Sequence, residues 1–397
     1  MRILVHWDDL TQAELIRLYL NVDENGIVIT TDSEAFRNLV ESSQSWDAIV
    51  LTTSHPDHDQ AYSIFQMVKE ARPECPIVAA CHPQDVYRLA RYLTAGLRSY
   101  LIRDSGGDYM FLLHAVIEGA IRQVEAELER LVSEKLRQEI DSVRQLQESI
   151  IPQNIICPPN YGIVARYESS QIRVIGGRPV TMAGGDYYDA FTLPDDSIIV
   201  LVGDASGHGM KACMSIMTMH TLIRMIRYDE FRDPAHFVAY VNRMLCQQSV
   251  VNNEGGFITL LYGILTPKTN EFRWAAAGHQ APILHELDSD TVTVIGDEDS
   301  AGLPIGIVSE AEYETHVSHL PSRARLLLYT DGIIEAFPGG QEEHVEFGVS
   351  GLIESLRSAR NLPLDATLQK LFKDSNAFTQ GSGRHDDTSV LLLERSE

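Results

Sequence analysis

The first 120 residues alternate short apolar runs with amphipathic segments. The apolar runs predict strands at Ile3–Val5, Ile27–Thr30, Ala48–Leu51, Ile77–Ala80 and Tyr100–Ile102. The segments between them have the apolar spacing of helices that bury one face, at Leu10–Leu20, Ser33–Ser42, Ala61–Ala71 and Pro83–Ala95. Regular alternation of strands and helices predicts a parallel sheet with helices on both of its faces.

A long helical segment without proline follows, from Tyr109 to about Ile151. Its apolar positions are Ile117, Ile121, Val124, Leu128 and Leu131, and then Leu136, Ile140, Val143, Leu146 and Ile150. The first group keeps the 4-3 spacing of a coiled-coil seam, and the step to Leu136 interrupts it like a stutter. An isolated solvated helix has no reason to keep such a stripe. The pattern therefore predicts a parallel homodimeric coiled coil.

From Pro152 onward the pattern changes to strands separated by glycine-rich turns, with a few helices. Strands are predicted at Ser197–Val202, Phe257–Leu265, Phe272–Ala276, Arg325–Tyr329 and Ser389–Leu393, and helices at Met210–Tyr228, Pro234–Ser249, Phe347–Ser358 and Leu364–Ser375. This texture predicts an α+β layered domain. The expected organisation is a domain over 1–120, a helical coiled-coil linker over 121–151 and a second domain over 152–397.

Composition narrows the possible partners and the compartment. The formal net charge of −24 argues against a nucleic-acid partner and suits metal ions or a basic protein surface. Five cysteines without a CxxC pair indicate a reducing compartment. No apolar run is long enough to cross a bilayer, and Trp7, Asp8 and Asp9 interrupt the first apolar stretch, unlike a signal peptide. We expect a cytoplasmic protein that binds neither membrane nor nucleic acid.

Several aspartates lie where predicted strands begin or end. In LLLYTDGIIEAF, Asp331 follows an apolar strand, and Asp-Gly alone would indicate only a turn. However, Asp204 follows another apolar strand, Asp186 precedes one that alternates aromatic and polar residues, and Asp386 and Asp387 precede the last strand. Each lies beside glycine or in a glycine-rich turn, where the backbone can approach a ligand closely.

Carboxylates that converge at a buried sheet end need a positive partner, because unpaired buried charge is costly. Apart from Arg384, no motif supplies a nearby base. Oxygen ligands without a cysteine or histidine cluster favour Mg²⁺ or Mn²⁺. Two such ions would offset four aspartates, and a two-metal centre can clamp a phosphate.

The motifs LQESIIP, MAGGDYYD, GDASGHG, AAAGHQAP, GLPIGI, LLLYTDGIIEA and DDTS, in this order, resemble the SpoIIE-like branch of the PPM, or protein phosphatase 2C-like, Ser/Thr phosphatases. The resemblance covers about residue 145 to the end. It implies a β-sandwich flanked by helices, with a binuclear Mn²⁺ or Mg²⁺ site. It also implies direct attack by water on a phosphoserine or phosphothreonine, without a phosphoenzyme.

The resemblance also implies roles for individual residues. Asp186, Asp204 and the carbonyl of Ala205 would hold one metal ion, and Asp204 would bridge to a second ion held by Asp331 and Asp386. Asp387 could replace Asp386, because spacing alone cannot phase a two-residue acid run. His208 and His279 could contact substrate or only shape their turns, and Lys211 and Arg384 could anchor phosphate or remain solvated. The family usually has threonine where Ser389 stands.

The N-terminal domain, whose pattern predicts a flavodoxin-like architecture, resembles the receiver domain of two-component response regulators. Thr52 stands where the family carries its phosphorylated aspartate, and the acidic pair is altered to Trp7-Asp8, followed by Asp9. Arg103 lies near the position of the family's lysine, and Cys81 or Ala80 near that of its hydroxyl residue. Without the acceptor carboxylate, the usual acyl-phosphate cannot form. The sequence therefore predicts a pseudo-receiver, with Asp57 and Asp59 as acids of a nearby polar loop.

These features favour a cytoplasmic protein phosphatase controlled by its N-terminal domain, through a partner or ligand that binds there. The family resemblance implies a phosphorylated STAS-type anti-sigma-factor antagonist as substrate, within bacterial partner switching. The alternative is a non-catalytic adaptor that binds a sigma factor or similar client. A pseudophosphatase would be expected to lose metal ligands, whereas all four positions are filled here.

Overall fold

The computed structural model describes residues 1–20, 26–104, 106–152, 154–172, 180–181, 184–207, 209–226, 232–248, 255–338, 345–381 and 386–397. The chain forms two compact units, Met1–Leu136 and Arg137–Glu397. The predicted division at residues 120 and 151 remains a prediction: one helix, α5 (Tyr109–Ile150), runs through residue 120 and ends just before residue 151.

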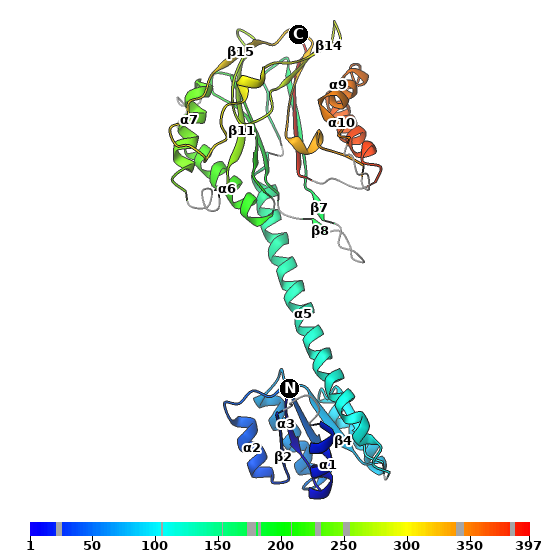
Figure 1. Ribbon diagram of the computed structural model, residues 1–397. Coiled ribbons are helices and arrows are strands. Elements are labelled where there is room, and N and C mark those ends of the chain that lie inside the picture. The colour runs from blue at the N-terminus through cyan, green and yellow to red at the C-terminus, as the bar shows by residue number, and fades with distance from the viewer. Residues whose placement is uncertain are drawn as a thin grey trace. The chain divides into compact units, whose positions relative to one another are not determined.

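The first unit is built on a five-stranded parallel sheet (Figure 1). Its strands are β1 (Arg2–His6), β2 (Gly26–Thr30), β3 (Ala48–Thr52), β4 (Ile77–Cys81) and β5 (Ser99–Ile102), in the order β2-β1-β3-β4-β5. Its helices are α1 (Leu10–Leu20), α2 (Ser33–Glu41), α3 (His58–Ala71), the 3-10 helix η1 (Pro83–Arg88), α4 (Leu89–Thr94) and the first part of α5. The predicted strands and helices are confirmed to within a few residues.

The helices cover both faces of this sheet, because the side chains of each strand alternate between the faces. One face packs against α1 and α5 through residues such as Val5, Val50 and Leu113. The other face packs against α2, α3 and α4 through residues such as Leu51 and Phe65. The two cores explain why the strands are almost continuously apolar.

The stripe along α5 has a different environment at each level of the helix. Ile117 is fully buried in the core of the N-terminal unit, so it packs against its own domain rather than against a second chain. Ile150 packs against the core of the second unit. Between them, Leu128, Leu131 and Leu136 are 41%, 50% and 58% exposed. The middle of the predicted seam is thus exposed and could pack against a second chain, whereas its two ends pack against cores of the same chain.

The second unit contains two five-stranded antiparallel sheets. The first has the order β15-β12-β11-β10-β9, with strands β9 (Asp186–Thr192), β10 (Ile198–Ala205), β11 (Ile258–Thr266), β12 (Glu271–Ala277) and β15 (His316–His319). The second has the order β14-β13-β16-β17-β6, with strands β6 (Tyr161–Glu168), β13 (Ile283–Glu286), β14 (Thr291–Val294), β16 (Ala324–Tyr329) and β17 (Thr388–Arg395). A short pair, β7 (Gln171–Ile172) and β8 (Val180–Thr181), lies apart from them.

The two sheets pack face to face, and helices cover their outer faces (Figure 1). Residues such as Val202, Trp274 and Leu328 fill the space between the sheets. Helices α6 (Met210–Met225) and α7 (Pro234–Leu245) cover the first sheet, and α9 (Gly348–Ser358) and α10 (Leu364–Phe378) cover the second. The 3-10 helices η4 (Glu298–Ala301) and η5 (Asp331–Ile333) complete the described elements. The predicted β-sandwich flanked by helices is confirmed.

Two details of the prediction need correction. Strand β10 continues to Ala205, so Asp204 lies inside the strand and not beyond its end. Strand β9 begins at Asp186 itself. In addition, the predicted helix ends at Tyr228 and Ser249 lie outside the described residues. Within the described residues, no helix combines the length and apolar character needed to span a bilayer.

Candidate active site

Asp186 and Asp204 lie directly opposite each other on neighbouring antiparallel strands, β9 and β10. Asp186 is buried, and its Oδ2 accepts a hydrogen bond of 2.6 Å from the hydroxyl of Thr330. Its other oxygen, Oδ1, has no hydrogen-bond partner in the described part of the chain. Two carboxylates thus face each other across a strand pair with little to neutralise them.

Thr330 connects this strand pair to the second sheet. It follows β16 and precedes Asp331, and it exchanges backbone and side-chain hydrogen bonds with Ser389 of β17. The amide of Ser389 donates to the Thr330 hydroxyl over 2.8 Å, while that hydroxyl donates to Asp186. Because the hydroxyl uses both its donor and its acceptor capacity, it fixes Asp186 relative to the end of β16, where Asp331 lies.

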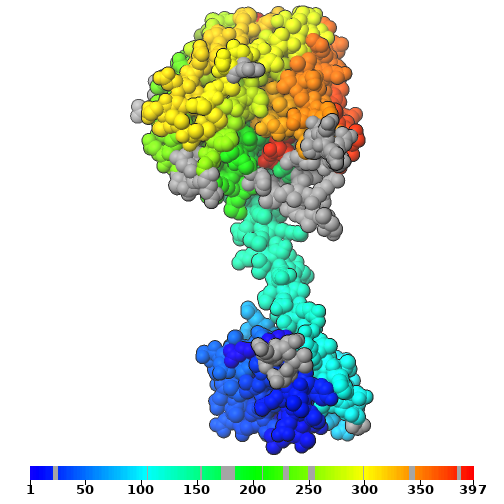
Figure 2. Space-filling model, in the orientation of Figure 1, coloured from blue at the N-terminus to red at the C-terminus, as the bar shows by residue number. Residues whose placement is uncertain are grey.

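Asp386 and Asp387 differ in their surroundings, although they are adjacent. Asp387 is buried, and its two carboxylate oxygens accept from the amides of Ser170 and Gly185 over 2.7 and 2.8 Å. The Asp386 side chain is exposed, and its Oδ1 accepts from the amide of Asp387 over 2.7 Å. Red C-terminal residues reach the surface between the green region of α6 and the orange region of α9 and α10 (Figure 2).

The pKa values show that these carboxylates repel one another. Burial, and then the charges of Asp204 and Asp387, raise the pKa of Asp186 well above its usual value. Burial, and then the charges of Asp331, Asp386 and Asp387, raise the pKa of Asp204 to about 8. Burial and the charge of Asp386 also raise the pKa of Asp331. The structure therefore brings the predicted acids of both sheets within each other's electrostatic influence.

The acid set fits a divalent cation in its chemistry. Its donors are oxygens only, one buried carboxylate oxygen lacks a partner, and the mutual repulsion calls for added positive charge. The backbone is also close, because a Cβ on Gly185 would lie 2.6 Å from the carbonyl oxygen of Ala205 and 2.9 Å from Asp204 Oδ1. In the described ranges, however, no group of three or more His, Cys, Asp or Glu side chains is arranged to hold a metal ion. The ligand assignment therefore remains a prediction.

The glycine after Asp331 serves the site as well as the turn. A Cβ on Gly332 would collide with the backbone carbonyl of Asp387. The Asp-Gly dipeptide therefore lets the acidic segment after β16 and the acidic segment before β17 approach closely, which a turn prediction alone does not explain.

Gln147, near the end of α5, is a residue of the site that sequence reasoning missed. It is fully buried, and its amide donates to the carbonyls of Gly184 and Asp186 and accepts from the amide of Gly184. These bonds clamp the backbone where β9 begins. Its place in the motif LQESIIP was the available signal.

The other residues weighed from the sequence lie in different settings. His279 is buried, and both of its ring nitrogens form hydrogen bonds within the protein. Lys211 is exposed in the first turn of α6, and its role as a phosphate anchor remains a prediction. His208 and Arg384 lie outside the described residues.

The corresponding edge of the N-terminal sheet is arranged differently. Thr52, at the end of β3, is buried. Arg103 donates to Asp8 over 2.7 Å and to Gln12 over 2.8 Å, and its guanidinium lies 4.6 Å from the ring centre of Trp7. Burial alone would raise the pKa of Asp8, but the bond and charge of Arg103 hold it below its usual value.

Asp57 and Asp59, expected in a polar loop, instead lie at the start of α3, where Asp57 is the N-cap residue and Asp59 belongs to the first turn. Asp57 caps α3 by accepting from the amides of Asp59 and Gln60, both over 2.9 Å. Asp59 accepts from Arg91 over 3.1 Å. Both acids therefore have local contacts that account for their presence.

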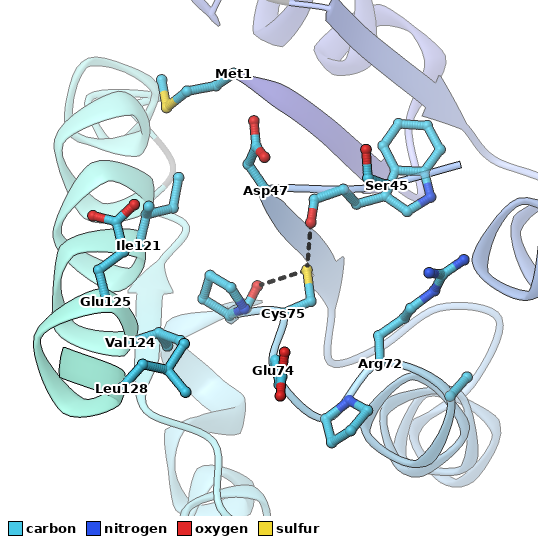
Figure 3. A pocket seen from close by; sticks show the side chains of 14 residues that line it. Met1, Ser45, Asp47, Arg72, Glu74, Cys75, Ile121, Val124, Glu125 and Leu128 are labelled. Carbon is cyan, nitrogen blue, oxygen red and sulfur yellow. Dashed lines mark hydrogen bonds between the residues drawn. The ribbon is translucent and has the colours of Figure 1, made fainter. Parts of the chain in front are cut away.

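The N-terminal unit has a groove of its own. It has a volume of about 660 Å³ and is lined by the loop around Arg72–Pro76 and by Ile121, Val124 and Leu128 of α5 (Figure 3). Cys75 in this loop donates to the carbonyls of Trp46 and Pro76. The groove thus exposes part of the predicted seam rather than a catalytic centre.

Comparisons with known proteins agree with the motifs. The family model described as Stage II sporulation protein E (SpoIIE) matches residues 194–396, slightly more than half of the chain. Phosphoserine phosphatase RsbU of Bacillus subtilis is 24% identical over 326 residues, which cover 79% of this chain and 87% of that protein. Protein IcfG of Synechocystis sp. is 22% identical over 343 residues, which cover 79% of this chain and about half, 51%, of that protein's length.

A solved structure supports the fold. The SiaA-PP2C domain of Pseudomonas aeruginosa superposes with a TM-score of 0.52 at 17% identity, covering 66% of this chain and 98% of that chain. Identity at this level shows a shared fold and not a shared substrate.

Proposed function

The chain belongs to the SpoIIE family of PPM phosphatases, and on this basis we propose that it is a metal-dependent protein serine/threonine phosphatase. The observation that carries the proposal is the gathering of Asp186, Asp204 and Asp331 from two sheets, where burial and the charges of neighbouring carboxylates raise their pKa values. A non-catalytic adaptor would have no need to retain these mutually repelling carboxylates.

We assign the ligands as follows. Asp186, Asp204 and the carbonyl of Ala205 would hold one Mn²⁺ or Mg²⁺ ion, and Asp204, Asp331 and Asp386 would hold a second. Divalent ions at such a site, when bound, activate water and stabilise the charge that develops on a transferring phosphoryl group. Thr330 orients Asp186, and Gly185 leaves room for the Ala205 carbonyl.

Asp386 suits the fourth position better than Asp387. Both oxygens of Asp387 already accept backbone hydrogen bonds, which hold the segment before β9 in place. Among neighbouring charges, that of Asp386 raises the pKa of Asp331 most. It also raises the pKa of Asp204. Asp387 would then organise the backbone around the site.

The proposed substrate is a phosphorylated STAS-type anti-sigma-factor antagonist in a partner-switching pathway. The similarity to the phosphoserine phosphatases RsbU and RsbP of Bacillus subtilis supports this class of substrate. The formal net charge of −24 is compatible with a protein substrate and with a basic regulatory partner.

We propose further that the N-terminal unit is a flavodoxin-like pseudo-receiver that controls the phosphatase through α5. The strand order β2-β1-β3-β4-β5 supports this architecture. The exposed middle of the α5 stripe supports a homodimeric coiled coil, because large apolar side chains on a helix are stabilised by burial. Gln147 supports the coupling, since it joins the end of α5 to the backbone of Asp186.

Hydrolysis of a phosphoserine protein or of p-nitrophenyl phosphate tests the enzymatic function. We expect turnover with Mn²⁺ or Mg²⁺ and its loss in EDTA, with recovery when the metal is restored. Full turnover in EDTA would exclude the metal-dependent mechanism, and an absence of turnover with both metals and a STAS phosphoprotein would favour the adaptor.

The double variant Leu128→Glu, Val143→Glu tests control through the dimer. Like charges in the seam should give a monomer by light scattering and alter phosphatase activity with the metal ligands intact. Arg122→Glu, an exposed change on the same helix, serves as the control for added charge. A variant that remains dimeric, or a monomer with unchanged activity and metal affinity, would reduce α5 to a tether.

A further inference from the structure

His279 connects the two sheets of the phosphatase unit at the end where the acids gather. Its Nδ1 lies 2.9 Å from the hydroxyl of Thr259 on β11, and its Nε2 lies 3.0 Å from the carbonyl oxygen of Tyr329 on β16. The ring is 2% exposed. It follows Gly278, whose φ of +68° turns the chain between β12 and β13.

Both partners of His279 adjoin proposed metal ligands. Thr259 is paired in register with Asp204 on the neighbouring strand, β10. Tyr329 is the last residue of β16 and is followed by Thr330, which bonds to Asp186, and then by Asp331. The imidazole therefore joins β11, the strand beside that of Asp204, to the end of β16 that leads to Asp331, in addition to the bond between Thr330 and Asp186.

We propose that His279 is a positioning residue, which sets the separation between Asp204 and Asp331 by tying β11 to the end of β16. The proposal rests on the phosphatase function proposed above. It assigns to the motif AAAGHQAP a role in assembling the metal site, without contact between the imidazole and substrate.

The chemistry of the two partners fixes the state of the ring. A carbonyl oxygen can only accept, so Nε2 must carry a proton and donate to Tyr329. In a neutral ring Nδ1 then accepts from the Thr259 hydroxyl. Burial lowers the pKa of His279 to about 4, so the ring is neutral at physiological pH. An apolar side chain could fill the same space, but it could not fix two polar groups at defined distances.

Isosteric changes at Thr259 give the sharpest test. Thr259→Val keeps the shape and removes the hydroxyl, whereas Thr259→Ser keeps the hydroxyl. With Mn²⁺ alone as the probe, calorimetry on the full chain should show weaker binding for Thr259→Val and near wild-type binding for Thr259→Ser. His279→Leu should weaken Mn²⁺ binding about tenfold, as expected when a group that orients ligands is lost. His279→Gln, which can donate and accept, should recover part of the affinity.

His285→Leu is the matched control. His285 is also buried, but its Nε2 contacts Asp290. In the strand register it lies opposite Arg325, at the other end of β16 from Tyr329. This change should lower thermal stability without changing Mn²⁺ affinity. A purely structural role for His279 would give the same result at both positions.

The outcomes separate this inference from the proposed function. If the wild-type chain neither binds Mn²⁺ nor hydrolyses phosphoserine, the phosphatase proposal fails, and the positioning role fails with it. If the wild type is active and folded Thr259→Val and His279→Leu bind Mn²⁺ normally with unchanged kcat, only the positioning role is overturned. Should His279→Leu not fold, the comparison of Thr259→Val with Thr259→Ser decides.

Discussion

Each unit places aspartates at one end of a β-sheet, but among the residues that the structure describes these acids have an arginine partner only in the N-terminal unit. Asp8 bonds to Arg103, whose guanidinium holds the pKa of that carboxyl below its usual value. In the second unit, burial and neighbouring carboxylates raise the pKa values of Asp186, Asp204 and Asp331. An acid paired with arginine is already neutralised, whereas repelling acids are stabilised by protonation or by a bound cation. The direction of the pKa shift thus distinguishes an acid that is paired within the protein from acids that a cation would stabilise, as proposed for the second unit.

The largest expected effect comes from removing one of the repelling acids. Asp204→Asn should reduce phosphatase turnover at least ~10²-fold, because loss of a bridging ligand removes several kcal/mol at about 1.4 kcal/mol per decade. Steady-state kinetics with Mn²⁺ would measure it. The control Asp233→Asn, at the start of α7, should retain turnover. Wild-type turnover in Asp204→Asn would remove the basis of the two-metal assignment.

The next largest effect comes from removing Arg103, the charged partner of Asp8. Arg103→Met keeps much of the apolar stem but leaves Asp8 without its charged partner. We expect the free energy of unfolding of the N-terminal unit to fall by about 2 kcal/mol, since a poorly solvated carboxylate loses its bond. Urea denaturation followed by the fluorescence of Trp7 and Trp46 would measure the change. Arg122→Met, at an exposed pair on α5, should change it by less than about 0.5 kcal/mol. Equal effects would argue against a special role for Arg103.

A smaller effect should appear as a pH dependence of the N-terminal unit. Burial, and then the nearby His55, lower the pKa of His6 to about 4, against an opposing effect from Asp32 and Asp8. The stabilisation is complete above pH 6.5 and is lost as pH falls toward 4, because the unfolded chain then binds the proton more readily. At pH 5.5 the loss should reach about 1.4 kcal/mol. His6→Asn should reduce this slope in urea titrations, and an unchanged slope would assign it to other groups.

The smallest expected effect is the absence of phosphorylation at the N-terminal unit. Thr52 has no carboxylate that could form an acyl-phosphate, and the Asp8 carboxylate already accepts a hydrogen bond from Arg103. Incubation with acetyl phosphate and Mg²⁺ should leave the intact mass unchanged, whereas a conventional receiver treated in parallel should gain one phosphate. An adduct on Asp8, Asp9, Asp57 or Asp59 would contradict the comparison.

Local patterns predicted most elements because each depends on neighbouring residues. Helix α1 (Leu10–Leu20) has the predicted bounds, and the strands of the N-terminal sheet differ from their predicted bounds by at most one residue at either end. The predicted bounds were less accurate in the second unit, where β10 continues past the predicted end at Val202, through Asp204 to Ala205. Pairing with β9 and β11 extends that strand, and such pairing is not visible in a local apolar run.

The sequence by itself determined the acids, their order and their association with strands. It could not distinguish Asp386 from Asp387, because adjacent residues share the same local pattern. Only the tertiary structure gives Asp387 two backbone donors and leaves the Asp386 side chain exposed. Likewise, only the packing of the sheets gives Thr330 its bond to Asp186 and His279 its two partners, across sequence separations of 144, 20 and 50 residues. These roles depend on hydrogen bonds between residues that are far apart in the chain. A local sequence pattern does not reveal such bonds, because folding brings the partners together.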